Sequence, residues 1–124
     1  IMIRMSNGIP VTIIECFRLE NCGPKNTGVA EHLTKLLSKY DTHELKRKFI
    51  IVFGEAERFD NLWINYVQYI KDINSNSNYG EKYPLSGFSV RDDLHNFSNM
   101  KVGISRHDNN GESVEVVHVM LNMK

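Results

Sequence analysis

The sequence lacks three features that would assign a class at once: an excess of charge of one sign, a set of cysteines and a long apolar run. Its 15 Lys and Arg balance 15 Asp and Glu, so a polyanion would have to meet a local basic patch. Two cysteines, Cys16 and Cys22, imply no disulfide framework and are typical of reduced thiols, which predicts a cytoplasmic protein. Without about eighteen consecutive apolar residues or a basic-then-apolar leader, neither a membrane span nor a signal peptide is expected.

What is present is sufficient for a globular domain. A hydrophobic fraction of 41% over 124 residues allows a real core, so we expect residues 1–124 to form a single domain. Because Ile1 lies inside the apolar alternation "IMIRM", we also expect the chain to be a fragment of a longer one.

The first half alternates strand-like and helix-like patterns. The runs "IMIRM" and "VTIIECF" are strand-like, and the Asn7-Gly8 pair between them predicts an antiparallel hairpin. Apolar residues at helical spacing predict one helix from Val29 to Tyr40 and another from Phe59 to Ile70. Between them, the continuous apolar run from Lys48 to Ala56 is typical of a central strand covered on both faces.

The second half is read in the same way. Residues 72–84 are polar and turn-rich, which predicts a loop. The runs "KVGISRH" and "ESVEVVHVML" are joined through "DNNG", which predicts a closing hairpin. The fold class that follows is α/β, with a mixed central sheet flanked by two helices and a C-terminal β-hairpin.

One acid interrupts the second strand-like run. Because side chains alternate along a strand, Glu15 shares a face with Ile13 and Phe17, whereas Cys16 and Arg18 point the other way. A carboxylate on a half-buried strand is costly unless it is paired, hydrogen-bonded or bound to metal. We therefore expect a partner for Glu15, either at a functional site or as a neighbouring structural base.

The order of these patterns resembles the PD-(D/E)xK, or restriction-endonuclease-like, nuclease superfamily. The stretch "IMIRMSNGIPVTIIECF" is similar to the family's hairpin that leads into Glu-x-Lys, "VAEHLTKLLSKYD" to its following helix, and "KFIIVFGEAERFDNLW" to the next strand and helix. The resemblance spans about residues 1–70 and is carried by pattern more than by identities. It implies a restriction-endonuclease-like core, outside which the closing hairpin lies.

The resemblance also implies site residues. Glu15 matches the second metal-binding carboxylate, and the backbone carbonyl of Cys16 matches the carbonyl that binds the Mg²⁺ or Mn²⁺ ion. Phe17 stands where the lysine is expected, and the first Asp of the motif would have to lie upstream of Ile1. In some members of the superfamily the lysine comes from the helix.

The helix offers two candidates for that part of the site. Lys35 is the candidate for the migrated lysine, and His32 lies about where the family's helix often carries Gln. Lys35 also follows Glu31 by four residues, which is the spacing of an ordinary surface ion pair.

Two functions of different classes follow. The first is a magnesium-dependent endonuclease cleaving DNA phosphodiesters, in a bacterial restriction or anti-phage effector whose other domains belong to the parent protein. The alternative is a catalytically inactive nuclease-like domain that binds DNA or protein. The expected partners are DNA, the remaining parent domains or further copies of the chain, and no membrane.

Two other candidate groups also have structural explanations. His107 and His118 flank the last turn and could face each other as metal ligands or general bases, or simply belong to a mixed polar hairpin. The bases Lys46, Arg47, Lys48 and Arg58 could meet a phosphate backbone or form a solvated rim.

Overall fold

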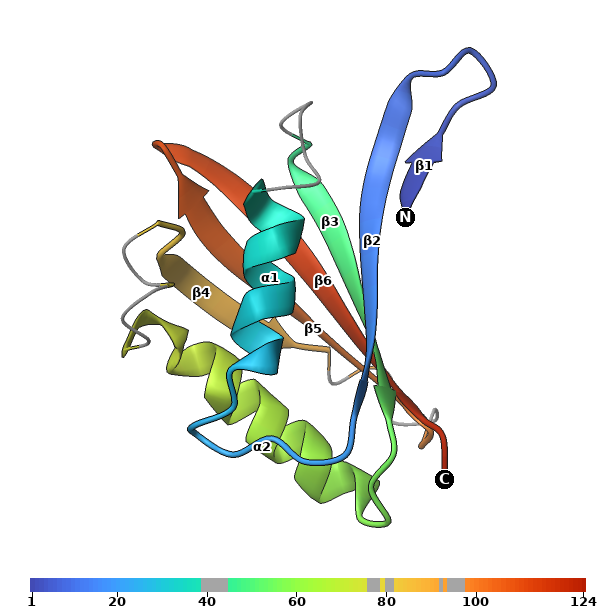
Figure 1. Ribbon diagram of the computed structural model, residues 1–124, viewed down its shortest axis with the longest axis vertical. Coiled ribbons are helices and arrows are strands. Elements are labelled where there is room, and N and C mark those ends of the chain that lie inside the picture. Colours follow the sequence, from blue (N-terminus) through green and yellow to red (C-terminus); the bar gives the residue numbers. More distant parts are fainter. Residues whose placement is uncertain (39–44, 76–78, 80–81, 92, 94–97) are drawn as a thin grey trace.

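Six strands form one sheet in the order β1-β2-β3-β6-β5-β4 (Figure 1). The computed structural model describes residues 1–38, 45–75, 79, 82–91, 93 and 98–124. The elements are β1 (Met2–Arg4), β2 (Pro10–Leu19), α1 (Gly28–Ser38), β3 (Arg47–Gly54), α2 (Phe59–Lys71), the short 3₁₀ helix η1 (Ile73–Ser75), β4 (Leu85–Val90), β5 (Met100–Asn109) and β6 (Glu112–Asn122). The predicted α/β class with a mixed sheet is confirmed.

The centre of the sheet is parallel and its margins are antiparallel. Strand β3 pairs in parallel with both β2 and β6, so the strand predicted to be central is central. Antiparallel pairs join β1 to β2, β4 to β5 and β5 to β6. Both predicted hairpin turns are present, with positive φ angles at Gly8, Asn110 and Gly111, a conformation that glycine and asparagine tolerate best.

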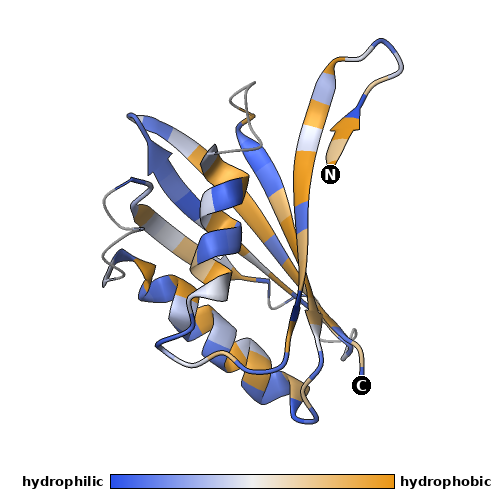
Figure 2. Cartoon of the chain, viewed as in Figure 1, coloured by the Kyte–Doolittle hydropathy of each residue, from blue (hydrophilic) through white to orange (hydrophobic). Residues whose placement is uncertain are grey.

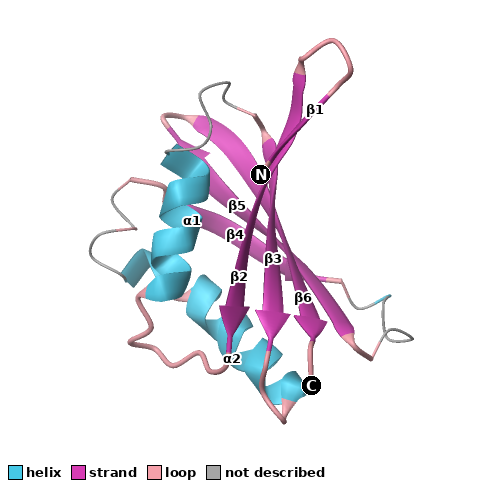
Figure 3. Cartoon of the chain, turned by 45° about the vertical axis from the view of Figure 1, so that its right-hand side comes forward, coloured by secondary structure: helices cyan, strands magenta, loops and turns pink. Residues whose placement is uncertain are grey.

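Both helices lie on the same face of the sheet (Figure 3). From α1, His32 contacts Glu15 on β2, and from α2, Tyr66 contacts His118 on β6. The expectation that β3 is covered on both faces is therefore wrong among the described residues, which cover one face only. A continuous apolar run does not distinguish the two cases, because a half-buried outer face can also be apolar.

The core fills the space between the two helices and the covered face. In each strand, every second side chain points towards the helices, and these side chains form the strand part of the core. The buried apolar strand residues include Ile13, Ile50, Val52, Val116 and Met120, and the buried helix residues include Leu33, Leu36, Tyr66 and Ile70. In Figure 2 the central strands are largely hydrophobic, whereas both helices carry hydrophobic and hydrophilic residues in turn.

Two local expectations need correction. Strand β4 lies in a segment for which no strand is predicted, because "LSGFSV" is short and rich in serine and glycine. Lys48 is not part of a solvated rim, since only 1% of it is exposed and its position on β3 has the parity of the buried Ile50. The end of the predicted first helix, residues 39 and 40, lies outside the described residues.

No helix among the described residues is long and apolar enough to span a membrane.

Candidate functional site

The acid of the second strand meets a histidine from α1. Alternation along β2 directs Glu15 and Phe17 towards the helices. At the start of α1, the side chain of Asn26 accepts a hydrogen bond from the backbone N–H of Val29 at 3.0 Å, which satisfies one of the free donors of the first turn. Helix α1 then places His32 Nδ1 3.0 Å from Glu15 Oε1, so the expected partner of Glu15 is found.

The imidazole of His32 is held on two sides. Its ring stacks on Phe17 with centroids 4.4 Å apart and planes 8° from parallel, while Nδ1 donates to the carboxylate of Glu15. The side chains of Glu15 and His32 are 14% and 30% exposed. Because Nδ1 is occupied, Nε2 is the ring nitrogen left to act as a base, a ligand or a hydrogen-bonding group.

Lys35 lies on α1 one turn after His32 and is half-buried. It makes no hydrogen bond or ion pair with any described residue, and the pair with Glu31 suggested by their spacing is not formed. The structure therefore places Lys35 near the Glu15–His32 pair along the helix without connecting it to the carboxylate.

The described residues do not complete a magnesium centre. Ile14 bonds to Ile1 through both its N–H and its C=O. Two residues later, Cys16 directs its carbonyl to the same edge of β2. Mg²⁺ takes about six oxygen ligands and is usually anchored by one or two carboxylates. Only one carboxylate is present here, and the described residues contain no group of three or more His, Cys, Asp or Glu able to hold a metal ion.

Phe17 reinforces this disagreement with the metal site. It stands in the position of the nuclease lysine but is 9% exposed and packed on His32. A phenyl ring supplies no positive charge to a phosphate, and here its packing has a structural role instead. Among the described residues, Glu15 is thus present at the position of the second carboxylate, and the position of the lysine is occupied by a packed aromatic ring.

A second polar cluster is buried between α2 and the β5–β6 hairpin. Tyr66 Oη is 2.6 Å from His118 Nδ1, and Ser105 Oγ is 2.7 Å from the Nε2 atoms of both His118 and His107. His107 Nδ1 is 2.9 Å from Tyr79 Oη and 3.4 Å from the carbonyl oxygen of Tyr83. We call the series Tyr66–His118–Ser105–His107–Tyr79 the buried chain.

The hydrogen bonds of the buried chain are coupled, because the single hydroxyl proton of Ser105 is donated to one ring while its oxygen accepts from the other. In one direction, His107 donates from Nδ1 to the carbonyl of Tyr83, and Nδ1 of His118 accepts the hydroxyl of Tyr66. In the other direction, Nδ1 of His107 accepts the hydroxyl of Tyr79, and His118 donates from Nδ1 to Tyr66 Oη. Every ring nitrogen of the two histidines is satisfied within the protein.

This arrangement favours the structural interpretation of His107 and His118. Both are completely buried, and the loss of solvation lowers the pKa of His107 to about 4 and that of His118 to about 3. Both rings are therefore neutral at neutral pH. With no free ring nitrogen, neither can bind a metal or accept a substrate proton without breaking the buried chain.

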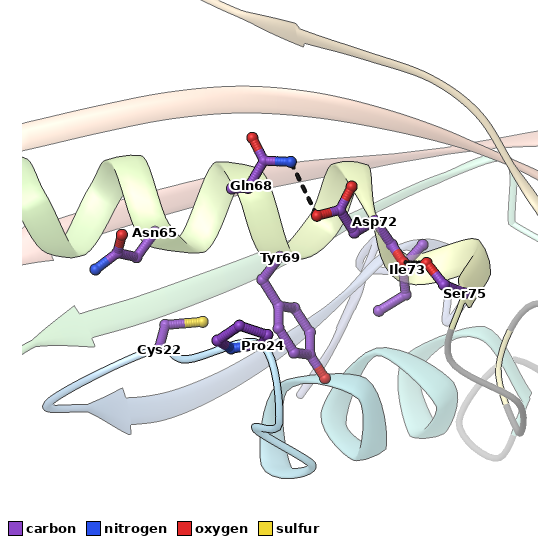
Figure 4. Close-up of a pocket in the computed structure, with 8 residues that line it drawn as sticks. All are labelled: Cys22, Pro24, Asn65, Gln68, Tyr69, Asp72, Ile73 and Ser75. Atoms are coloured by element: carbon purple, nitrogen blue, oxygen red, sulfur yellow. Dashed lines mark hydrogen bonds between the residues drawn. The ribbon is translucent and has the colours of Figure 1, made fainter.

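A cavity of about 390 Å³ separates α2 from the segment that follows β2 (Figure 4). Its lining includes Cys22, Tyr69 and Asp72. Burial raises the pKa of the Cys22 thiol to about 11, so this sulfur is protonated and a poor nucleophile. Asp72 accepts a hydrogen bond from Gln68 at 2.9 Å. The cavity therefore offers polar contacts, among them the Asp72 carboxylate, and its thiol is not activated.

The side of the sheet that faces away from the helices carries apolar side chains on each of the four adjacent strands β2, β3, β6 and β5. We call this surface the open face, because no described element covers it. Its outward residues are Ile1 and Ile3 beside β2, Ile14 and Cys16 on β2, Phe49, Ile51 and Phe53 on β3, Val117, Val119 and Leu121 on β6, and Met100, Val102 and Ile104 on β5. Those on β2, β3, β5 and β6 are half-buried by one another.

Charged pairs border the open face. Arg18 and Glu55 form a bidentate ion pair with a shortest N–O distance of 2.8 Å. At the other end of the strands, Glu115 accepts from Arg47 at 2.8 Å and lies 3.5 Å from Arg106. Arg18 thus pairs with Glu55, on the opposite face from Glu15.

Comparison with protein-family models, with curated proteins and with solved structures found no match to this chain.

Proposed function

We propose that this chain is a protein-docking domain on a restriction-endonuclease-like scaffold, and that the open face is its docking surface. The observation that carries the proposal is the row of outward apolar residues on four adjacent strands, including Ile51, Val119 and Val102. Support for the scaffold comes from the order of hairpin, helix, central strand and helix. Among the described residues, Glu15 is the one side chain that matches the metal-binding carboxylates implied by the same resemblance.

Parallel strands explain why such a face needs a partner. Parallel sheets occur almost always with both faces covered, and their strands are apolar on both sides. Here β2, β3 and β6 are parallel, but α1 and α2 cover only one side. Covering one half-exposed Ile, Val or Phe side chain stabilises the assembly by about 1 kcal/mol, so a layer over the whole face would be held by several such contributions.

A metal-dependent nuclease acting on DNA is the second candidate function. The observation that favours it is that Glu15 and Cys16 are neighbours on β2, where Glu15 offers a carboxylate and the carbonyl of Cys16 points to the edge of the strand. It needs a second carboxylate beyond the described residues, with Lys35 as the cation. Its test is cleavage of supercoiled plasmid with Mg²⁺ or Mn²⁺ against chelator, comparing the wild type with Glu15→Ala and Lys35→Ala.

The docking proposal is tested by the reactivity of the two thiols. Cys16 lies on the open face and is half-exposed, whereas Cys22 is 4% exposed. At low protein concentration, a small maleimide should modify Cys16 much faster than Cys22, and Cys16→Ser identifies the fast site. If Cys16 in the folded monomer reacts as slowly as Cys22, the face is covered within the chain and the docking proposal fails. Metal-dependent cleavage lost in Glu15→Ala would instead establish the nuclease.

A further inference from the structure

We infer that the occupant of the open face is a second copy of this chain, with two sheets packed face to face about a twofold axis. This inference rests on the proposed docking function and identifies its partner. Sheets that pack in this way lie about 10 Å apart with their strands within about 30° of each other. In a twofold dimer the same surface is used by both copies, so it must be complementary to itself.

The apolar surface continues from the sheet onto the N-terminal hairpin. Ile1 exchanges backbone hydrogen bonds with Ile14, and Ile3 pairs with Thr12, so both isoleucine side chains extend the open face past β2. They are 77% and 42% exposed. The β1–β2 hairpin projects from the rest of the sheet (Figure 1), where it can reach beyond one copy to lie against the other.

The accessible surface of the chain is larger than its mass predicts. A folded monomer of 14.3 kDa is expected to expose about 6,800 Å², whereas this chain exposes 7494 Å². The difference of about 700 Å² describes the chain as a whole. An interface of standard size buries roughly 800 Å² on each partner, and in the proposed dimer that area comes from the open face and its charged rim.

The charges around the open face are compatible with a copy of the same surface. Arginine and glutamate occur at both ends of the strands, as Arg18 with Glu55 and as Arg47 with Glu115. A twofold axis across the strands brings the Arg18–Glu55 pair of one copy towards the Arg47–Glu115 pair of the other, where exchanged pairing avoids contacts between like charges. The chain has no net charge, so long-range repulsion between copies does not oppose association.

A second copy fits these observations better than DNA does. An apolar surface with paired charges at its rim offers few unpaired cations to phosphates, which provide most of the affinity of DNA-binding proteins. The composition matches the apolar core and polar rim of a homodimer interface.

The test is the mass of the protein in solution as its concentration varies. Sedimentation and light scattering on the whole chain from about 1 to about 200 µM should show a mass rising towards twice 14.3 kDa. Ile51→Glu places a charge at the centre of the open face and should weaken association about tenfold or more. Ile64→Glu is the matched control, because Ile64 is 62% exposed on α2 in the opposite layer, and it should dimerise like the wild type.

A third variant keeps the test decisive if Ile51→Glu does not fold. Ile3 is already exposed at the margin of the open face, so Ile3→Glu should retain the circular dichroism spectrum and melting temperature of the wild type while it weakens the dimer. Modification of Cys16 should slow as the wild-type concentration rises, and should not slow in Ile3→Glu.

The outcomes separate this inference from the docking function. A wild type that stays monomeric while Cys16 remains reactive overturns the second copy and leaves the open face to a different protein. A dimer that both Ile51→Glu and Ile3→Glu leave intact also overturns it, because association then uses another surface. A monomer in which Cys16 is unreactive removes the docking function itself.

Discussion

Ser105 Oγ lies 2.7 Å from Nε2 of His107 and 2.7 Å from Nε2 of His118. One hydroxyl thus donates to one ring and accepts from the other. It connects His107, two residues further along the chain, with His118, thirteen residues further along. The connection assigns both rings to the core of the protein. It also makes the serine the group on which the buried chain depends most.

Replacing that serine should be costly for its size. Ser105→Ala leaves an N–H of one histidine without an acceptor and a ring lone pair of the other without a donor, and each buried unsatisfied group costs about 1–3 kcal/mol. We expect the free energy of unfolding in urea to fall by about 2–4 kcal/mol. Ser113→Ala, at an exposed position on β6, is the control and should change it by less than about 0.5 kcal/mol. Equal effects of the two substitutions would contradict the buried chain.

Acid should destabilise the fold through the same histidines. Their pKa values fall from 6.5 to about 4 for His107 and to about 3 for His118, so below pH 6.5 the unfolded chain binds protons that the folded chain does not. The stabilisation due to the neutral histidines is therefore fully present above pH 6.5. It declines as the pH falls towards 4, by at most about 1.4 kcal/mol per pH unit for each histidine.

The variant His118→Gln separates this effect from other titrations. The variant removes one titrating ring. Between pH 7 and pH 4, the free energy of unfolding should therefore depend on pH less steeply than in the wild type, and the difference in slope corresponds to up to about one bound proton. An unchanged slope would show that His118 is not held neutral by burial.

Close packing of β4 against β5 should make any side chain larger than hydrogen destabilising at one glycine. A Cβ atom added at Gly103 would lie 2.6 Å from Cζ of Phe88, and that ring in turn packs near His118 with centroids 5.7 Å apart. Gly103→Ala should cost about 1–3 kcal/mol of stability. At Gly87 on β4 an added Cβ meets nothing within 4 Å, so Gly87→Ala is the matched control, and a thermal melt of both variants decides.

The Glu15–His32 pair should contribute measurable coupling. A double-mutant cycle with Glu15→Gln, His32→Ala and the combined variant isolates the interaction, which for a partly exposed pair should be about 1 kcal/mol. Urea unfolding provides the four free energies. A coupling of zero would mean that the 3.0 Å contact adds nothing to stability, and the carboxylate would then be held by β2 alone.

Local periodicity predicted much of the framework. Alternation alone placed Glu15 and Phe17 on one face with Cys16 on the other, and Asn-Gly located the last turn, because these patterns depend on neighbouring residues only. The same alternation could have identified Lys48 as buried, since it shares the parity of Ile50 and Val52. Its cluster with three other bases suggested a solvated rim instead.

The buried chain and the open face could not be predicted in this way. Tyr66, Ser105 and His118 come from three elements whose contacts depend on the sheet order, and the only local signal was that Ser105 and His107 share a parity. Likewise, an apolar run such as "FIIVF" in β3 does not reveal whether one face or both faces are covered. That difference is decided by where the connecting helices pack.

The hydrogen bonds of the buried chain couple two histidines on different strands. Because Ser105 has one hydroxyl proton, it donates to only one of the two rings and accepts from the other. Reversing any one bond would require all of them to reverse together. The two imidazoles should therefore show opposite tautomers in nitrogen NMR spectra: when one ring carries its proton on Nδ1, the other carries it on Nε2.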